Sequence, residues 1–298
     1  MSLIIAEVSE NDGFYVADTL ISHQFEDPRI GPGPFNGKFH ALKVHILNEN
    51  LCIALAGDYS LGIKIVSSFA TYLNENKQRT GKELIQSIFT LYQEECLKQK
   101  KEINVCEFLV MCNIDDHNIL AKISENGVEY FETTYIGNCD AYRRLQSLRQ
   151  LYVAPSQSHN QQPDGTFKWE PLTISDLEKN FFEITEGMEK ISEQNGSMGV
   201  ASLSLGATRV RINKAGKFEY LQTGMRGTSP WENSIGISQL TSMFPKYGVG
   251  MFFQGAKIGY VFISGDIEYC RKIEVGNIKD FIKFAYDNYQ LAFTGVTW

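Results

Sequence analysis

Helical segments come in blocks along this chain instead of following every strand. Apolar residues repeat at helical spacing over residues 63–73 and again over residues 82–98, and strand-like runs precede and follow this pair. A doubly wound parallel sheet needs a helix after each strand, so this order argues against one. It favours an α+β fold in which helices cover antiparallel sheets.

Turn residues between apolar runs predict a series of hairpins. The predicted strands cover residues 2–9, 14–19, 39–47, 51–56, 105–113, 119–124, 128–135, 208–213, 217–222, 258–264 and 269–274. Further helices are predicted at residues 137–150, 175–194 and 278–291. We predict one domain over residues 1–298, with insertions near 25–38, 150–190 and 224–256 and a C-terminal extension.

Composition excludes several classes of protein. The formal net charge of −7 argues against nucleic acid as a partner, because phosphate binding needs clustered Lys and Arg. No apolar run approaches the ~18–20 residues of a membrane-spanning helix, so no membrane partner is expected. The six cysteines are scattered without the spacing of a metal site, which predicts reduced thiols, no bound metal and a cytoplasmic protein.

Four residues among the first 60 suggest a catalytic site. Ser2 follows the initiator methionine, which is normally removed before a small residue, and its α-amine would then be free. Lys43 interrupts an apolar strand, and a buried lysine needs a partner, for which Asp18 is a candidate. Gly57 ends the next strand just before a helix, where backbone N–H groups can stabilise an oxyanion.

These residues suit nucleophilic catalysis by the first residue of a chain. An α-amine titrates near ~7.7–8.0, and a neighbouring lysine cation favours its neutral form. A neutral amine can take the proton of the Ser2 hydroxyl and so activate a weak nucleophile. This mechanism requires no metal or cofactor.

With these motifs the chain resembles the proteasome β-subunit and HslV family of N-terminal nucleophile (Ntn) hydrolases. The matching features are the nucleophile before the first strand, Ala17-Asp18-Thr19, the strand lysine Lys43, and Ala56-Gly57-Asp58 before the first long helix. The spacings from Ser2 to Asp18 and from Lys43 to Gly57 agree with the family without a gap. The match is good to about residue 100 and continues weakly through Gly137 and the hairpin at Gly216.

The resemblance implies a fold, an activity and partners. The fold would be a four-layer αββα sandwich of two antiparallel sheets covered by helices. The protein would be a peptidase acting on peptides or unfolded chains, with Ser2 as the nucleophile, Lys43 tuning its amine, Asp18 holding Lys43 and Gly57 supplying the oxyanion N–H. His45, Leu55 and Tyr59 would line the pocket for the substrate side chain. Family members assemble into rings and receive chains from an ATPase, so a homo-oligomer is expected.

Several alternatives stay open at this point. The Lys43–Asp18 pair can be purely structural in a catalytically inactive scaffold or assembly subunit of the same family, and a small-amide amidase is a third possibility. The family's Gly-Ser-Gly motif is replaced by Gly137-Asn138-Cys139, and catalysis requires that Met1 be removed. Asp58 is interpreted as a helix N-cap, and His117 as part of a turn.

Overall fold

The computed structural model describes fourteen segments of the chain: residues 2–10, 12–18, 20–22, 38–75, 81–114, 117–149, 157–161, 167–171, 175–195, 208–221, 224–226, 236–243, 245–268 and 270–294. These residues form three five-stranded sheets and two two-stranded sheets, and every strand pair is antiparallel. Five α-helices and one short 3₁₀ helix, η1 (Ile103–Val105), accompany them.

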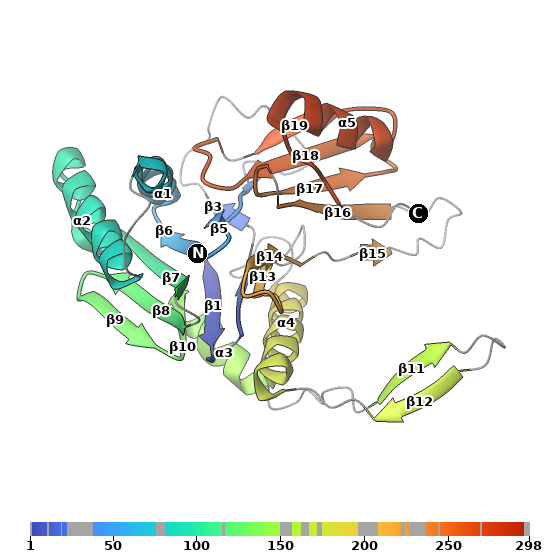
Figure 1. The fold of residues 1–298 in the computed structure, drawn as a ribbon, viewed down its shortest axis with the longest axis horizontal. Coiled ribbons are helices and arrows are strands. Elements are labelled where there is room, and N and C mark those ends of the chain that lie inside the picture. The colour runs from blue at the N-terminus through green and yellow to red at the C-terminus, as the bar shows by residue number, and fades with distance from the viewer. Residues whose placement is uncertain are drawn as a thin grey trace.

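The first sheet has the strand order β10-β1-β2-β13-β14. Its strands are β1 (Leu3–Val8), β2 (Gly13–Ala17), β10 (Thr133–Gly137), β13 (Thr208–Ile212) and β14 (Phe218–Tyr220). Because β1 and β2 are almost entirely apolar, both can be buried on their two faces. In the strand order β1 lies between β10 and β2, so it is an interior strand of this sheet and not an edge strand (Figure 1).

The second sheet has the sequential order β5-β6-β7-β8-β9. Its strands are β5 (Val44–Asn48), β6 (Leu51–Gly57), β7 (Cys106–Ile114), β8 (His117–Ser124) and β9 (Gly127–Phe131). The two helices predicted from apolar periodicity, α1 (Tyr59–Glu75) and α2 (Gly81–Gln99), interrupt the sequence between β6 and β7. Their apolar side chains pack on one face of this sheet, which explains why the two helices follow one another.

Two interior clusters connect the first sheet to its neighbours. One cluster joins Ile4 and Tyr15 of the first sheet to Val44 and Ala54 of the second. Another packs Leu3 and the opposite face of the first sheet against helices α3 (Cys139–Arg149) and α4 (Asp176–Asn195). The first sheet is therefore covered on both faces.

The predicted four-layer sandwich of two sheets is wrong, because the chain contains a third five-stranded sheet. Its strands are β15 (Gly224–Arg226), β16 (Gly236–Ser242), β17 (Gly248–Phe253), β18 (Ile258–Ile263) and β19 (Arg271–Glu274), and helix α5 (Ile278–Tyr289) packs on one face. The other face contributes Val249, Met251 and Phe262 to the core shared with the first two sheets. The protein is thus richer in sheet than predicted, and Figure 1 places this sheet and α5 above the other two sheets.

Residues 224–256, whose composition indicates loops, contain the strands β15 to β17, and a glycine in β17 shows why the composition misleads. A Cβ atom on Gly250 in β17 would lie 2.6 Å from the ring of Phe293. Gly259 in β18, a strand that the sequence predicts, is similar, since a Cβ atom there would lie 2.1 Å from the ring of Phe281. In this sheet the glycines make room for aromatic rings, although glycine-rich sequence more often marks turns.

The remaining elements refine the predicted boundaries. The strand predicted at 128–135 is two strands, since residue 132 separates β9 of the second sheet from β10 of the first. Two small hairpins complete the fold: β3 (Leu20–Ser22) with β4 (Lys38–His40), and β11 (Gln157–Gln161) with β12 (Phe167–Pro171). Most of the predicted insertion at 25–38 lies outside the described residues, whereas that near 150–190 includes β11, β12 and most of α4.

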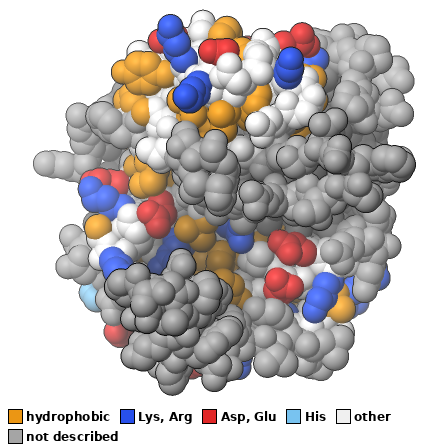
Figure 2. All heavy atoms as spheres, turned by 90° about the vertical axis from the view of Figure 1, so that its right-hand side faces the viewer, with side chains coloured by type: hydrophobic (Ala, Val, Ile, Leu, Met, Phe, Trp, Pro, Cys, Tyr) orange, Lys and Arg blue, Asp and Glu red, His pale blue; other side chains and the backbone are white. Residues whose placement is uncertain are grey.

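Two observations concern membrane-spanning helices and surface charge. None of the described helices is both long enough and apolar enough to cross a lipid bilayer. On the face drawn in Figure 2, acidic and basic side chains of the described residues are interspersed instead of gathered by sign.

Candidate active site

The predicted nucleophile Ser2 immediately precedes β1 and is held through its backbone. The Asn138 N–H donates to the Ser2 carbonyl oxygen over 2.7 Å. The next residue, Leu3, donates its N–H to the Asp18 Oδ1 atom over 3.0 Å and accepts from the Asp18 N–H over 3.2 Å. The start of β1 is therefore fixed from both neighbouring strands, β10 and β2.

Glycine at position 137 makes the contact on the β10 side possible. Gly137 has a φ of +99°, and a Cβ atom there would lie 2.1 Å from the Ser2 carbonyl oxygen. Any other residue would combine a strained backbone with a collision against Ser2. Gly137 thus permits the close approach of β10 to the first residue of the site.

Lys43 and Asp18 form the ion pair expected from the sequence. Lys43 Nζ lies 2.8 Å from Asp18 Oδ1, and the two side chains are only 1% and 0% exposed. Burial lowers the pKa of the Lys43 ammonium, and the carboxylate of Asp18 opposes this shift. The other carboxylate oxygen, Asp18 Oδ2, is buried without a hydrogen-bond partner among the described residues.

Gly57 ends β6 in a backbone conformation that favours glycine. Its φ is +99°, and a Cβ atom would lie 2.2 Å from the Val105 carbonyl oxygen. The Leu55 N–H donates to the Lys43 carbonyl oxygen, whereas the Asp58 N–H donates to Val105 on the opposite side. Since N–H groups alternate along an antiparallel strand, the Gly57 N–H points to the same side of β6 as that of Leu55, the side on which β5 lies.

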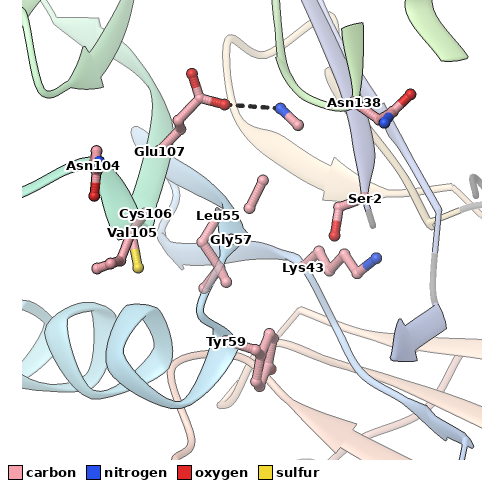
Figure 3. A pocket seen from close by; sticks show the side chains of 12 residues that line it. Ser2, Lys43, Leu55, Gly57, Tyr59, Asn104, Val105, Cys106, Glu107 and Asn138 are labelled. Carbon is pink, nitrogen blue, oxygen red and sulfur yellow. Dashed lines mark hydrogen bonds between the residues drawn. The ribbon is translucent and has the colours of Figure 1, made fainter. Parts of the chain in front are cut away.

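Five of the seven predicted site residues line one pocket of about 390 Å³: Ser2, Lys43, Gly57, Leu55 and Tyr59. Figure 3 shows the Ser2 hydroxyl directed toward the Lys43 side chain, with Gly57 and Tyr59 on the other side of the space. The Tyr59 hydroxyl donates to the Leu42 carbonyl oxygen over 2.9 Å, which fixes its ring in the wall. The pocket thus places a hydroxyl, a cation and a backbone N–H around one space.

The other two predicted residues lie outside the pocket lining. Asp18 is beneath Lys43, as its predicted supporting role requires. His45 is buried and accepts a hydrogen bond from the Gly265 N–H, in the turn after β18, at its Nδ1 atom over 3.1 Å. Burial lowers the pKa of His45 to about 3, so its ring is neutral at neutral pH. His45 therefore joins β5 to the third sheet and is not part of the pocket wall.

Sequence reasoning missed the wall formed by η1 and the start of β7. Asn104, Val105, Cys106 and Glu107 line the pocket opposite Ser2. Glu107 carried a usable signal, because it is an acid in an otherwise apolar strand, as Lys43 is a base in one. The thiol of Cys106 is a poor nucleophile, since burial raises its pKa to about 12.

Three other predicted features have a structural position. Asp58 accepts the Leu61 N–H at Oδ1 over 3.1 Å, which confirms its N-cap role at α1. His117 is exposed, and its neighbours 115 and 116 lie outside the described residues. Within the described segments, no group of three or more His, Cys, Asp or Glu side chains is placed to hold a metal ion.

The chain matches no protein-family model, and no curated protein matches it. Any functional assignment must therefore be argued from the residues of the pocket.

Proposed function

We propose that this chain is an amide hydrolase of the N-terminal nucleophile type, acting on peptide bonds through Ser2 after removal of Met1. The observation that carries the proposal is the meeting of Ser2, Lys43 and Gly57 in one pocket, with Lys43 held by the buried Asp18 carboxylate. None of the described residues that line this pocket belongs to the third sheet.

The first half of the reaction forms an acyl-enzyme. The neutral α-amine of Ser2 takes the hydroxyl proton while Oγ attacks the carbonyl carbon of the substrate. Negative charge develops on the carbonyl oxygen, and the Gly57 N–H donates to it. The C–N bond then breaks, and the leaving amine takes the proton from the α-ammonium group, which leaves an ester on Ser2.

The second half returns the enzyme to its starting state. The α-amine removes a proton from a water molecule, which attacks the ester carbonyl. The C–O bond to Ser2 breaks, the proton returns to Oγ, and a carboxylic acid is released. Lys43 favours the neutral amine in both halves, because a nearby cation disfavours protonation of a second amine.

Other properties of the proposed enzyme follow from the resemblance stated above. We propose a cytoplasmic homo-oligomer, with peptides or unfolded chains as substrates and an ATPase as a partner. Light scattering measures the oligomeric state directly. A monomer at working concentration would overturn the proposed homo-oligomer, whereas the chemistry of Ser2 has a separate test.

The decisive experiment follows Ser2 itself. Intact mass establishes whether Met1 has been removed, and a serine-directed acylating probe then reports nucleophilicity by adding its mass to Ser2. We expect labelling of the wild type, hydrolysis of a fluorogenic peptide panel, and loss of both in Ser2→Ala. Ser9→Ala is the matched control, since Ser9 is an exposed serine next to the other end of β1.

Three results would overturn all or part of the proposal. Retention of Met1 blocks the amine and excludes this mechanism. A processed protein that is neither labelled nor active, and is indistinguishable from Ser2→Ala, would support the scaffold alternative. Hydrolysis of small amides without any peptide cleavage would assign the amidase instead.

A further inference from the structure

We propose that Glu107 is a positioning residue of this pocket: its carboxylate, itself held by Lys122, fixes Gly137 and thereby the backbone of Ser2. This inference rests on the proposed function where it concerns catalysis, but its structural part can be tested separately. Glu107 belongs to β7 of the second sheet, and Gly137 ends β10 of the first sheet.

The contact between these residues bridges the two sheets at the pocket. Glu107 Oε2 accepts the Gly137 N–H over 2.9 Å, which is the dashed line in Figure 3. The next N–H along the chain, that of Asn138, donates to the Ser2 carbonyl oxygen. A shift of Gly137 therefore displaces the N–H that holds Ser2, because the two planar peptide units that carry these N–H groups meet at the Gly137 Cα atom.

Lys122 on β8 holds the Glu107 carboxylate in place. Its Nζ atom lies 2.8 Å from Glu107 Oε1 and 3.4 Å from the Tyr135 carbonyl oxygen. Nζ also lies 5.6 Å from the centre of the Tyr135 ring. Together, Lys122 and Glu107 contact residues 135 and 137 of β10, so the end of that strand is held at two points.

Two other roles for Glu107 fit the contacts less well. As a selector of cationic substrates it would need an available carboxylate, yet both of its oxygens are already bonded to Lys122 and Gly137. As a stabilising ion pair it would contribute little, because both side chains are partly exposed to solvent. What the geometry favours is a local role at the start of β1.

The first measurement is the rate of Ser2 acylation by the serine-directed probe in Glu107→Ala. We expect a decrease of roughly 10- to 100-fold, because a misplacement of about 1 Å near a reacting group can cost ~100-fold in rate. For peptide hydrolysis kcat should fall while KM stays unchanged, as for an interaction that matters to the transition state and not to substrate binding. Glu107→Gln should lose less, since its amide oxygen can still accept the Gly137 N–H.

Amide hydrogen exchange tests the structural part without any activity. In Glu107→Ala we expect faster exchange at residues 137 and 138 and unchanged exchange in α2, which has its own packing on the second sheet. Glu274→Gln is the matched control, because Glu274 also pairs with a lysine, Lys272 at 2.7 Å, in β19 of the third sheet. It should change neither exchange at 137 and 138 nor acylation.

The outcomes separate this inference from the proposed function. If wild-type Ser2 is not acylated, the proposed function fails, and exchange at residues 137 and 138 alone decides whether Glu107 fixes this turn. If the wild type is acylated and Glu107→Ala reacts at the same rate, the positioning role is overturned while the proposed function stands. Unchanged exchange at 137 and 138 overturns the inference in either case.

Discussion

Lys43 Nζ lies 2.8 Å from Asp18 Oδ1, and both side chains are buried. The pair joins the residue before β5 to the residue after β2, and so links the second sheet to the first. Asp18 also accepts the Leu3 N–H, so one carboxylate connects the pocket cation to the start of β1.

Removal of one member of this pair should lower the free energy of unfolding much more than removal of both. We expect Asp18→Ala to lower the free energy of unfolding by about 3–5 kcal/mol, because it leaves a buried ammonium without its carboxylate. The double variant Asp18→Asn/Lys43→Met should recover most of this loss, since it buries no charge and keeps an acceptor for Leu3. Urea denaturation measures all three proteins, and a double variant no more stable than Asp18→Ala would contradict the prediction.

The close contact between Gly137 and Ser2 predicts that a substitution at Gly137 affects both stability and Ser2 acylation. Gly137→Ala should destabilise the protein by about 1–3 kcal/mol through backbone strain and also displace the Ser2 carbonyl group. Gly127→Ala separates the two effects, because Gly127 has a φ of +104° with nothing within 4 Å of the position that a Cβ atom would take. Thermal unfolding should change in both variants, whereas Ser2 acylation should fall only in Gly137→Ala. Equal acylation in the two variants would argue against the contact.

The buried His45 predicts a pH dependence of stability. Its folded-state pKa of about 3 lies below the ordinary value, so the unfolded chain binds the proton more readily as the pH falls. Above about pH 6.5 the His45 ring is neutral in both states, and protonation does not reduce the free energy of unfolding. As the pH falls from there toward the folded-state pKa, protonation of the unfolded chain lowers the free energy of unfolding by ~1.4 kcal/mol per pH unit. Urea unfolding from about pH 7.5 to about pH 4.5 should show a smaller slope in His45→Gln than in the wild type.

The matched control for this prediction is His117→Gln, at an exposed histidine on β8. It should leave the slope of stability against pH as it is in the wild type. An identical slope in His45→Gln and in the wild type would show that His45 does not carry the dependence.

Close packing of glycine against aromatic rings predicts where the third sheet is intolerant of change. Gly259→Ala would place a methyl group 2.1 Å from a Phe281 ring atom, and we expect a cost of about 1–3 kcal/mol for such overpacking. Gly276→Ala is the control, because the nearest atom to its Cβ position is 3.8 Å away. Calorimetry compares the two variants, and equal melting temperatures would contradict the packing argument.

The sequence predicted which residues meet in this pocket better than it predicted the whole architecture, for local reasons. Lys43 is visible because a charge in an apolar strand demands a partner, and Gly57 because a strand ends there just before a helix. Glu107, like Lys43, is a charged residue in an otherwise apolar strand, yet a single acid in a strand is equally compatible with a solvent-facing position. Its contact with Gly137 depends on the packing of one sheet against another, which local sequence does not report.

Long-range contacts account for the other errors. His45 lies on the strand that follows Lys43, but its Nδ1 atom is occupied by Gly265, which is 220 residues away in sequence. The sequence of β15 to β17 indicates loops because glycine, serine and proline favour turns, whereas β18 and β19 of the same sheet are predicted as strands. The rings of Phe281 and Phe293 account for Gly250 and Gly259, and both rings come from residues that follow this sheet in the sequence.

The interior position of β1 has a consequence for the order of events in folding. β1 pairs with β10 through Leu3 and Gly137, and its neighbour β2 pairs with β13 through Ala17 and Thr208. Such distant partners raise the contact order, and loop closure must precede the contacts that reward it. The start of β1 consequently gains its β10 partner only once residue 137 has been synthesised, and β2 gains its β13 partner only once residue 208 has been.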